Sequence, residues 1–373
     1  MDFNLSIPIK VISGKGVLKK NSFLLRQFGS KCLVVTGGSS AVLSGALDDV
    51  RAALGDCEIE YKVFDKIGPN PLISACHEAG KLANDFGAEF IIGIGGGSPL
   101  DGAKAAAVYA ANPKFAPIDI YTPADERNKA LPTVLIGTTA GTGSEVGRVS
   151  VLTNGETGRK KSISSDDLYP VLTFADSTYT QSMPYKITVS TALDALSHAT
   201  EGYFSNKCGD IPTMFAEKAI PMIWEGLCQL EKTKAVPDEA MREQLYYGSL
   251  YAGITLAYCG TAFPHPLGYV LTENYGTPHG TACAAFMPEL FLRAEKFESK
   301  KTARLMSIMG TDIEQFCKII SSLTDCGDIA MSEDEIEKYC SRWDAAIPNN
   351  FKFSPGGFTK EEAVKMFRSK YLK

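Results

Sequence analysis

The chain has 373 residues, of which 45% are hydrophobic and 22% are charged. This length exceeds what one ordinary hydrophobic core encloses, so we expect a globular protein of two domains. The formal net charge of -5 and the lack of a basic cluster exclude an electrostatic footprint for nucleic acid or an anionic membrane. A small molecule is therefore the expected partner.

The apolar runs, the first residues and the cysteines of the sequence indicate where in the cell the protein is located. No apolar run reaches the roughly 18 to 20 residues that span a bilayer, and residues 1–5 lack the basic start of a signal peptide. We therefore expect no membrane partner and a cytoplasmic location. The ten cysteines are scattered without a CxxC pair, and we interpret them as reduced thiols, several of them small core residues.

Short apolar runs alternate with helical spacing in the first half of the chain, which predicts repeated β-α-β units. Strands are expected at 31–36, 59–64, 90–94 and 134–137, and helices at 44–54, 72–86 and 99–111. This rhythm predicts a parallel sheet with helices on both faces. Ligands bind such sheets beyond the carboxyl ends of the strands.

One glycine-rich loop follows the predicted strand at 90–94 and opens a helix that contains Asp101. Its residues are Gly95, Gly96, Gly97 and Ser98. Backbone N–H groups at a helix N-terminus can receive a pyrophosphate, although this loop does not match the GxGxxG fingerprint of dinucleotide sites. A tight turn without a ligand is the alternative interpretation.

A second loop, residues 138–145, also follows a predicted strand and consists mostly of small and hydroxyl-bearing residues. Small residues let the backbone approach a ligand closely, and the hydroxyls of Thr138, Thr139 and Thr142 can bond phosphate or ribose. Such a loop on its own is more often a plain turn. Two such loops after strands of one predicted sheet indicate a nucleotide site.

A third loop, residues 37–40, bears on the choice of nicotinamide cofactor. Sites that favour NAD often place an acidic residue near the ribose 2′-hydroxyl, where it repels a 2′-phosphate. No carboxylate occurs here before Asp48, and the hydroxyls of Ser39 and Ser40 could accept the phosphate of NADP. A solvated turn explains these two serines nearly as well.

The hydrophobic period changes after two further β-like runs at 149–153 and 171–176. From residue 188 onward the sequence is mostly helical, and we predict a domain boundary near residue 183, with domains at 1–182 and 183–373. Later helices are expected at 213–231, 238–258 and 281–298, and a last one begins at the Thr359–Glu362 capping box.

One aspartate and three of the four histidines of the chain form a candidate metal site. Asp194 and His198 share a face one turn apart if their segment is helical. His265 and His279 lie in stretches with proline and glycine that look like connections between helices. This nitrogen-rich set suits iron, zinc, cobalt or nickel, and suits calcium or magnesium poorly. The fourth histidine, His77, is expected at the surface.

Taken together, these motifs resemble those of the iron-containing, group III alcohol dehydrogenases over nearly the whole chain. The resemblance is carried by residues 95–104, 138–146 and 194–199, and by His265 and His279 with Gly280 behind it. It implies an α/β dinucleotide-binding domain with a parallel, Rossmann-like sheet, followed by an all-α domain. This is the architecture of dehydroquinate synthase, with a cleft that holds metal and nicotinamide.

The resemblance also implies roles for individual residues. Asp194, His198, His265 and His279 match the family's metal ligands, and they would act in catalysis through iron, or alternatively zinc. Gly37 stands where NAD-preferring members commonly have aspartate, so NADP(H) is favoured over NAD(H). Six residues match the family's cofactor contacts: Gly97, Ser98, Asp101, Thr138, Thr139 and Lys160. Together with the residues of the three loops, the predicted cofactor-binding set also includes Gly37, Ser39, Ser40, Gly95, Gly96 and Thr142.

Two positions depart from the family pattern. Tyr269 stands four residues after His265, where many members have a histidine close to the nicotinamide. Gly147 and Arg148 follow Val146 where members usually continue with Thr-Pro. Arg148 is either a solvated surface residue or faces the cleft, where it would meet an anionic substrate or the cofactor phosphate.

We therefore expect a metal-dependent alcohol dehydrogenase or aldehyde reductase that transfers hydride between a small alcohol or aldehyde and NADP(H) or NAD(H). The metal would act as a Lewis acid on the substrate oxygen, and the resemblance suggests a homodimer or larger oligomer. One alternative is a polyol or sugar-phosphate dehydrogenase, or a dehydroquinate-synthase-like lyase, which requires a cationic cluster. Another is a metal- and nucleotide-binding sensor without turnover.

Overall fold

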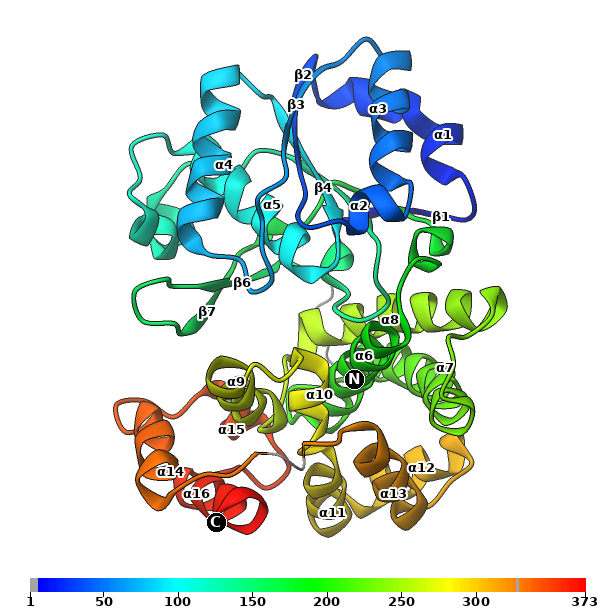
Figure 1. Cartoon of the computed structure of the whole chain (residues 1–373), viewed down its shortest axis with the longest axis vertical. Coiled ribbons are helices and arrows are strands. Elements are labelled where there is room, and N and C mark those ends of the chain that lie inside the picture. The colour runs from blue at the N-terminus through cyan, green and yellow to red at the C-terminus, as the bar shows by residue number, and fades with distance from the viewer. Residues whose placement is uncertain (1–5, 327–328) are drawn as a thin grey trace. The chain divides into compact units, whose positions relative to one another are not determined.

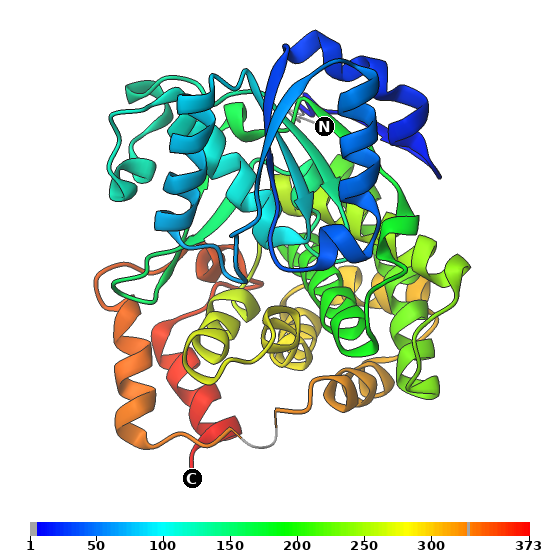
Figure 2. The same cartoon turned by 45° about the horizontal axis from the view of Figure 1, so that its top comes forward.

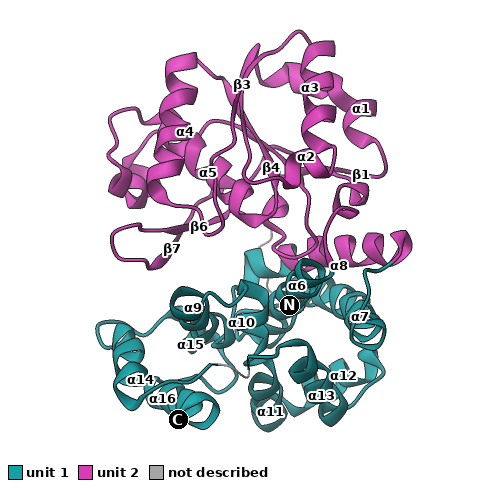
Figure 3. Cartoon of the chain, in the orientation of Figure 1, with its two compact units in different colours: residues 1–3, 185–237, 254–373 teal, residues 4–184, 238–253 magenta. Residues whose placement is uncertain are grey.

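The computed structural model describes residues 6–326 and 329–373 (Figures 1 and 2). These residues form two compact units, coloured magenta and teal in Figure 3. The sheet unit comprises residues 6–184 and 238–253, and the helical unit comprises residues 185–237 and 254–373 without 327–328. Within the described ranges, no helix is both long and apolar enough to cross a membrane.

A six-stranded sheet forms the centre of the sheet unit, with strand order β1-β8-β5-β4-β2-β3. Every neighbouring pair is parallel, which confirms the predicted parallel sheet. The four-residue edge strand β1 was not predicted, because its side chains stay mostly exposed and show no apolar alternation. The strands are β1 (Lys10–Ser13), β2 (Lys31–Val35), β3 (Glu60–Phe64), β4 (Phe90–Gly95), β5 (Thr133–Gly137) and β8 (Leu172–Ala175).

Helices cover both faces of this sheet, as Figure 1 shows. Successive side chains of a strand point to opposite faces, so Leu33 packs in the core under α4 and α5, whereas Val34 packs in the core under α1 and α3. The predicted α/β arrangement is therefore confirmed. The covering helices are α1 (Val17–Asn21), α3 (Ala46–Asp56), α4 (Ile73–Phe86) and α5 (Gly97–Ala111).

A separate antiparallel hairpin joins β6 (Val149–Thr153) to β7 (Lys160–Ser164). The run at 149–153 was predicted as a strand. Its partner β7 was not, because it contains two lysines and its side chains are only partly covered. A short helix, α2 (Ser40–Leu43), follows the loop after β2.

The helical unit is organised around α6 (Tyr185–Phe204), which is buried on all sides over its last two turns. A helix with no solvent-facing side belongs to a core, and α6 packs against α7, α9, α10 and α11. The remaining helices are α7 (Asp210–Thr233), α8 (Glu239–Cys259), α9 (Pro264–Tyr275), α10 (His279–Ala284), α11 (Met287–Phe297), α12 (Ser299–Met309), α13 (Ile313–Leu323), α14 (Glu333–Cys340), α15 (Asn349–Phe353) and α16 (Lys360–Tyr371).

Two details of the helical part concern helix boundaries. The single helix predicted at 281–298 is two helices, because the chain turns at Ala285 and Phe286 and Pro288 suits the first turn of the new helix α11. The predicted capping box is confirmed: Thr359 Oγ1 accepts from the Glu362 N–H at 3.2 Å, and Glu362 Oε2 accepts from the Thr359 N–H at 2.9 Å.

The predicted domains, 1–182 and 183–373, differ from the compact units in one segment. Residues 238–253 include the first part of α8, and they pack with the sheet unit. The contact is tight, since a Cβ atom at Gly253 would lie 2.7 Å from the Cα of Gly143. The boundary near residue 183 therefore stays a prediction, because the compact units do not show which parts of the chain fold independently.

Candidate metal centre and nucleotide-binding edge

Two of the four predicted metal ligands lie on α6. Asp194 and His198 are one turn apart in this helix, which confirms the helical spacing expected from the sequence. Both side chains are buried, and His198 Nε2 lies 3.7 Å from Asp194 Oδ1. The pair therefore presents one oxygen and one nitrogen to the same point inside the helical unit.

The other two histidines lie in helices and not in connections, which corrects the expectation from the sequence. His265 belongs to the first turn of α9, and His279 is the first residue of α10. The prolines that suggested loops begin these helices instead, because proline fits the first turn, where its missing N–H costs no bond. His265 Nε2 lies 3.9 Å from Asp194 Oδ1, and His279 Nε2 lies 3.7 Å from the same oxygen.

The four side chains therefore place three imidazole nitrogens around one carboxylate oxygen. Donors at about 2.1 Å from a tetrahedral ion lie about 3.4 Å from one another, and the separations of 3.7 to 3.9 Å are only slightly larger. A site of this size with mostly nitrogen donors fits a divalent transition metal better than calcium or magnesium.

A fifth residue, Glu201, orients His265. It was not predicted from the sequence. Its Oε1 lies 2.7 Å from His265 Nδ1, and its Oε2 accepts from the Ala262 N–H at 2.8 Å. A carboxylate on one ring nitrogen directs the other nitrogen to a metal. Burial raises the pKa of the Glu201 carboxyl, and His265 opposes that rise. The signal in the sequence was a glutamate seven residues after Asp194, which is two turns along the same helix face.

Replacing Glu201 tests this role. We expect Glu201→Gln to weaken metal binding about 10- to 100-fold, because the loss of the carboxylate leaves the His265 ring less well oriented and less basic. The measurement is the metal dissociation constant by competition with a chelator. Glu295→Gln, which changes an exposed carboxylate on α11, is the matched control. An unchanged constant for Glu201→Gln would remove Glu201 from the site.

Tyr269 and Arg148, the two departures from the family pattern, take different positions. The Tyr269 ring stacks on that of His279, with ring centres 5.5 Å apart, so it lies beside the metal ligands. Burial raises the pKa of the Tyr269 phenol well above its ordinary value, and the group therefore stays protonated at neutral pH. Arg148 forms an ion pair with Asp166, whose carboxylate is largely exposed.

The three predicted nucleotide loops meet at one edge of the sheet unit. They follow β2, β4 and β5, and β4 pairs with both of the other strands. Because all three strands are parallel, their carboxyl ends and the loops behind them lie side by side. The sequence predicted each loop separately, and the strand order brings them together.

Small residues are required where two of these loops touch. A Cβ at Gly97 would lie 2.6 Å from Thr142 Cγ2, and one at Gly96 would lie 3.0 Å from Thr139 Cγ2. The loop after β5 is also tied to the end of β4, since the Thr138 N–H donates to the Gly95 carbonyl at 2.9 Å. We call residues 138–145 the threonine loop. The start of α5 and this loop therefore form one surface of backbone and hydroxyl groups.

Ser98 and the serines after β2 lie at helix starts. Ser98 is in the first turn of α5, and its Oγ accepts from the Asn70 N–H at 3.1 Å. Ser39 is exposed and immediately precedes α2, and Ser40 is the first residue of that helix. These positions leave the Ser39 hydroxyl accessible to solvent and to a ligand.

Asp101 has structural bonds inside the sheet unit. Its Oδ1 accepts from Ser144 Oγ at 2.6 Å, and its Oδ2 accepts from the Val151 N–H at 2.8 Å. Burial raises the pKa of the Asp101 carboxyl, and the positive charges of Lys104 and Lys160 oppose that rise. Asp101 therefore joins α5 to the threonine loop and to β6, and Lys160 at the start of β7 lies close enough to act on its charge.

Lys104 is a further buried anchor in this region. Its Nζ donates to the Ser144 carbonyl at 2.7 Å and to the Val149 carbonyl at 2.9 Å, and the residue has no exposed surface. Burial lowers the pKa of Lys104 to about 8, and the negative charge of Asp101 opposes that shift. The lysine of the 95–104 motif thus holds the segment after the threonine loop against α5.

Gly37 has a packing reason to be glycine. A Cβ atom there would overlap the backbone carbonyl oxygen of Ile67, and Gly37 forms a bridge with Lys66. The missing side chain is thus required by the neighbouring chain, whichever nicotinamide binds. The identity of residue 37 alone is therefore a weaker argument for NADP(H) than the sequence suggested.

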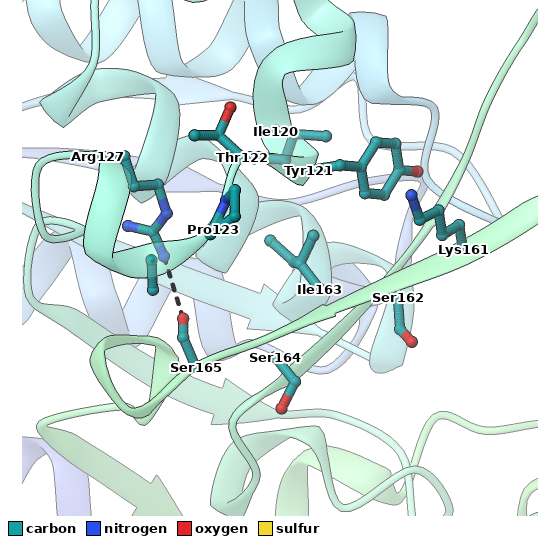
Figure 4. A pocket seen from close by; sticks show the side chains of 11 residues that line it. Ile120, Tyr121, Thr122, Pro123, Arg127, Lys161, Ser162, Ile163, Ser164 and Ser165 are labelled. Atoms are coloured by element: carbon teal, nitrogen blue, oxygen red, sulfur yellow. Dashed lines mark hydrogen bonds between the residues drawn. The ribbon is translucent and has the colours of Figure 1, made fainter. Parts of the chain in front are cut away.

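A cavity of about 210 Å³ in the sheet unit contains none of the predicted site residues (Figure 4). Its charged groups already have partners. Arg127 donates to both carboxylate oxygens of Asp167, at 2.7 and 3.0 Å, and to Ser165 Oγ at 3.0 Å. Lys161 Nζ lies 4.1 Å from the centre of the Tyr121 ring. Arg127 and Lys161 therefore both have contacts within the fold.

Comparisons with known proteins match both parts of the chain. Residues 8–177 match the model for iron-containing alcohol dehydrogenases, and residues 188–369 match the C-terminal model of the same family. An NADPH-dependent butanol dehydrogenase of Clostridium saccharobutylicum is 30% identical over 326 residues, which cover 87% of this chain and 78% of that protein.

Two solved structures extend this likeness to the fold. An iron-containing alcohol dehydrogenase from Thermotoga maritima superposes with a TM-score of 0.89 at 33% identity, over 99% of both chains. A sulfoacetaldehyde reductase from Bifidobacterium kashiwanohense, in complex with NAD+, superposes with a TM-score of 0.87 at 26% identity, again over 99% of both chains. The chain therefore belongs to the iron-containing alcohol dehydrogenase family and is an oxidoreductase of alcohols and aldehydes.

Proposed function

We propose that this enzyme interconverts a small alcohol and its aldehyde, with an iron ion held by Asp194, His198, His265 and His279. The observation that carries the proposal is the set of three Nε2 atoms at 3.7 to 3.9 Å from one buried carboxylate oxygen. When bound, the metal supplies a Lewis acid for the substrate oxygen, and a nicotinamide supplies or accepts the hydride.

The residues of the helical unit prepare this chemistry. Asp194 contributes the negative charge of the donor set, and Glu201 keeps the His265 ring turned toward the same point. Burial raises the pKa of the Tyr269 phenol, so in the protein without metal the group is a hydrogen-bond donor at neutral pH. Its ring covers one face of the His279 imidazole and limits the access of water to that side.

The dinucleotide is proposed to bind at the three loops of the sheet unit. The N-terminus of α5 at Gly97 would receive the pyrophosphate, because helix N-termini favour anions. The hydroxyls of Thr138, Thr139 and Thr142 would bond phosphate or ribose. Support comes from the contact between these loops, and from relatives named as NADPH-dependent or solved with NAD+.

The proposal includes a preference for NADP(H) over NAD(H). It is supported by the hydroxyls of Ser39 and Ser40 at the start of α2 and by the lack of a carboxylate in residues 37–40. We expect Ser39→Ala with Ser40→Ala to weaken NADPH binding at least about tenfold, because a single hydrogen bond to a charged group contributes about 1.5–3 kcal/mol. NADH binding should stay unchanged.

Fluorescence titration of the nucleotides measures this effect, and Ser74→Ala, at an exposed position on α4, is the matched control. If wild-type protein binds NADH at least as tightly as NADPH, the preference is wrong. Gly37→Asp is a poor probe, because its Cβ would overlap the Ile67 carbonyl. If Gly37→Asp bound NADPH more weakly, the loss would reflect local distortion of the backbone as well as any effect of the new charge.

The reaction itself is tested with protein loaded with Fe(II) in the absence of oxygen. We expect oxidation of NADPH in the presence of short aldehydes and reduction of NADP+ by the corresponding alcohols. Net consumption of nicotinamide also separates a dehydrogenase from a lyase that uses NAD transiently. No turnover with either nicotinamide across the panel would refute the proposal. The lyase alternative requires a cationic cluster for a phosphate or carboxylate, and Arg148, its candidate from the sequence, forms an ion pair with the largely exposed Asp166.

A further inference from the structure

Cys283 lies beside the proposed metal ligands. It is buried, and it follows His279 by one turn of α10. Its Sγ is 3.5 Å from His279 Nδ1 and 3.8 Å from His279 Nε2. One ligand atom each from Asp194, His265, His279 and Cys283 all lie within 4.8 Å of one another. In the described part of the chain, no other cysteine belongs to such a group.

Close packing holds the Cys283 side chain at this point. A Cβ at Gly268 of α9 would lie 2.7 Å from the Cys283 nitrogen and 2.8 Å from its Sγ. The glycine therefore lets α9 and α10 approach each other at Cys283. These two helices also carry His265 and His279, so the packing that brings two of the proposed ligands together places the sulfur beside them.

We propose that Cys283 is a ligand of the metal together with Asp194, His265 and His279, the three residues that share its group, and that it binds through its thiolate. In forming this bond the thiol loses its proton to solvent, and no electron transfer occurs. With a metal–sulfur bond of about 2.3 Å and metal–nitrogen bonds of about 2.1 Å, sulfur and nitrogen lie about 3.1 to 4.4 Å apart, depending on the angle. The 3.8 Å between Cys283 Sγ and His279 Nε2 lies within this range.

A sulfur ligand changes which metal the site prefers. Nitrogen and oxygen donors accept both iron and zinc, whereas thiolate favours the softer ion, zinc, over iron(II). Cys283 therefore makes this chain a stronger binder of zinc relative to iron than the Asp and His donors alone. The inference rests on the proposed metal site, so its test must separate a failure of Cys283 from a failure of that site.

Cobalt(II) provides this separation, because its visible d–d bands report binding and a near-ultraviolet charge-transfer band reports a thiolate ligand. We expect both signals in the wild-type protein. Cys283→Ser and Cys283→Ala should lose the charge-transfer band and keep the visible bands. Cys317→Ser, which changes a partly buried cysteine on α13, is the control and should keep both signals.

A second readout is the ratio of zinc to iron(II) affinity, measured by competition. We expect this ratio to fall at least about tenfold in Cys283→Ser, given that changes around metal ligands typically alter affinity 10- to 100-fold. Visible bands without a charge-transfer band in the wild type would overturn the role of Cys283 and leave the metal site standing. A band that persists in both Cys283 variants would also overturn it. Failure of the wild type to bind cobalt would overturn both proposals.

Discussion

Asp194→Ala is expected to abolish metal binding and turnover together. Asp194 Oδ1 is the atom around which the three Nε2 atoms are arranged, at 3.7 to 3.9 Å. A Lewis-acid metal supplies several kcal/mol to the reaction, and each 1.36 kcal/mol changes a rate tenfold. We therefore expect kcat/KM to fall at least about 1,000-fold, together with metal content close to background. Elemental analysis and steady-state kinetics on the same preparation measure both.

The control for this variant is Asp210→Ala, which removes an exposed carboxylate at the start of α7. It should keep both metal and activity. Circular dichroism and thermal unfolding show whether Asp194→Ala is still folded, and Asp194→Asn repeats the test with nearly unchanged side-chain volume. A folded Asp194→Ala protein that retains its metal and its turnover would show that the donor set has been wrongly identified.

Gly280→Ala is expected to have the second-largest effect, although residue 280 is not a metal ligand. An added Cβ would overlap the Ser190 carbonyl oxygen and lie 2.8 Å from the Cβ of Asp194. Helix α10 must then move away from α6, and His279 moves with it. Changes in the residues that position a metal ligand typically weaken metal affinity about 10- to 100-fold, and we expect a loss of that order. The overpacking should also destabilise the fold by about 1–3 kcal/mol.

Metal titration and denaturant unfolding check the two parts of this prediction. Gly209→Ala is the matched control in the same unit, because its φ is -90° and no atom would lie within 4 Å of the new Cβ. It should leave metal affinity unchanged. Because Gly209 is the N-cap residue of α7, where alanine is less favourable than glycine, the overpacking cost is the part of the stability loss in Gly280→Ala that exceeds the loss in Gly209→Ala. Wild-type metal affinity in Gly280→Ala would show that α10 can shift without displacing His279.

The parts of the fold that the sequence predicted are those with a strong apolar signal. Strands β2, β4 and β5 are almost entirely buried, and their apolar runs stand out in the sequence. The missed strands β1 and β7 are short and mostly exposed, so they are defined by their hydrogen-bonded partners and not by their composition. The prediction of a single helix at 281–298 was wrong for a different reason. The apolar residues continue through the turn at Ala285 and Phe286, so the apolar pattern gives no sign of the break.

The candidate site was likewise predictable only where its residues are marked by local sequence patterns. Spacing paired Asp194 with His198 because the two are close in sequence, whereas His265 and His279 were selected by residue type and by the family's motifs. The spacing of Glu201 from Asp194 places both on one face of α6, but its partner His265 is 64 residues away, so only the packing of α9 on α6 reveals the contact. Cys283 was interpreted only as one of ten reduced thiols, since nothing in its neighbouring residues distinguishes it from the other nine cysteines. Its proximity to Asp194 appears only when α10 and α6 are in place.

Helix α8 has a consequence for how the chain acquires its structure during synthesis. Residues 238–253 complete the sheet unit, where Arg242 donates to the carbonyls of Thr180 and Met183 at 2.7 and 2.9 Å, and Tyr246 is fully buried. A ribosome that has released only residues 1–184 has therefore not yet delivered every part of that core. The sheet unit cannot finish folding until α6 and α7 of the other unit have also emerged.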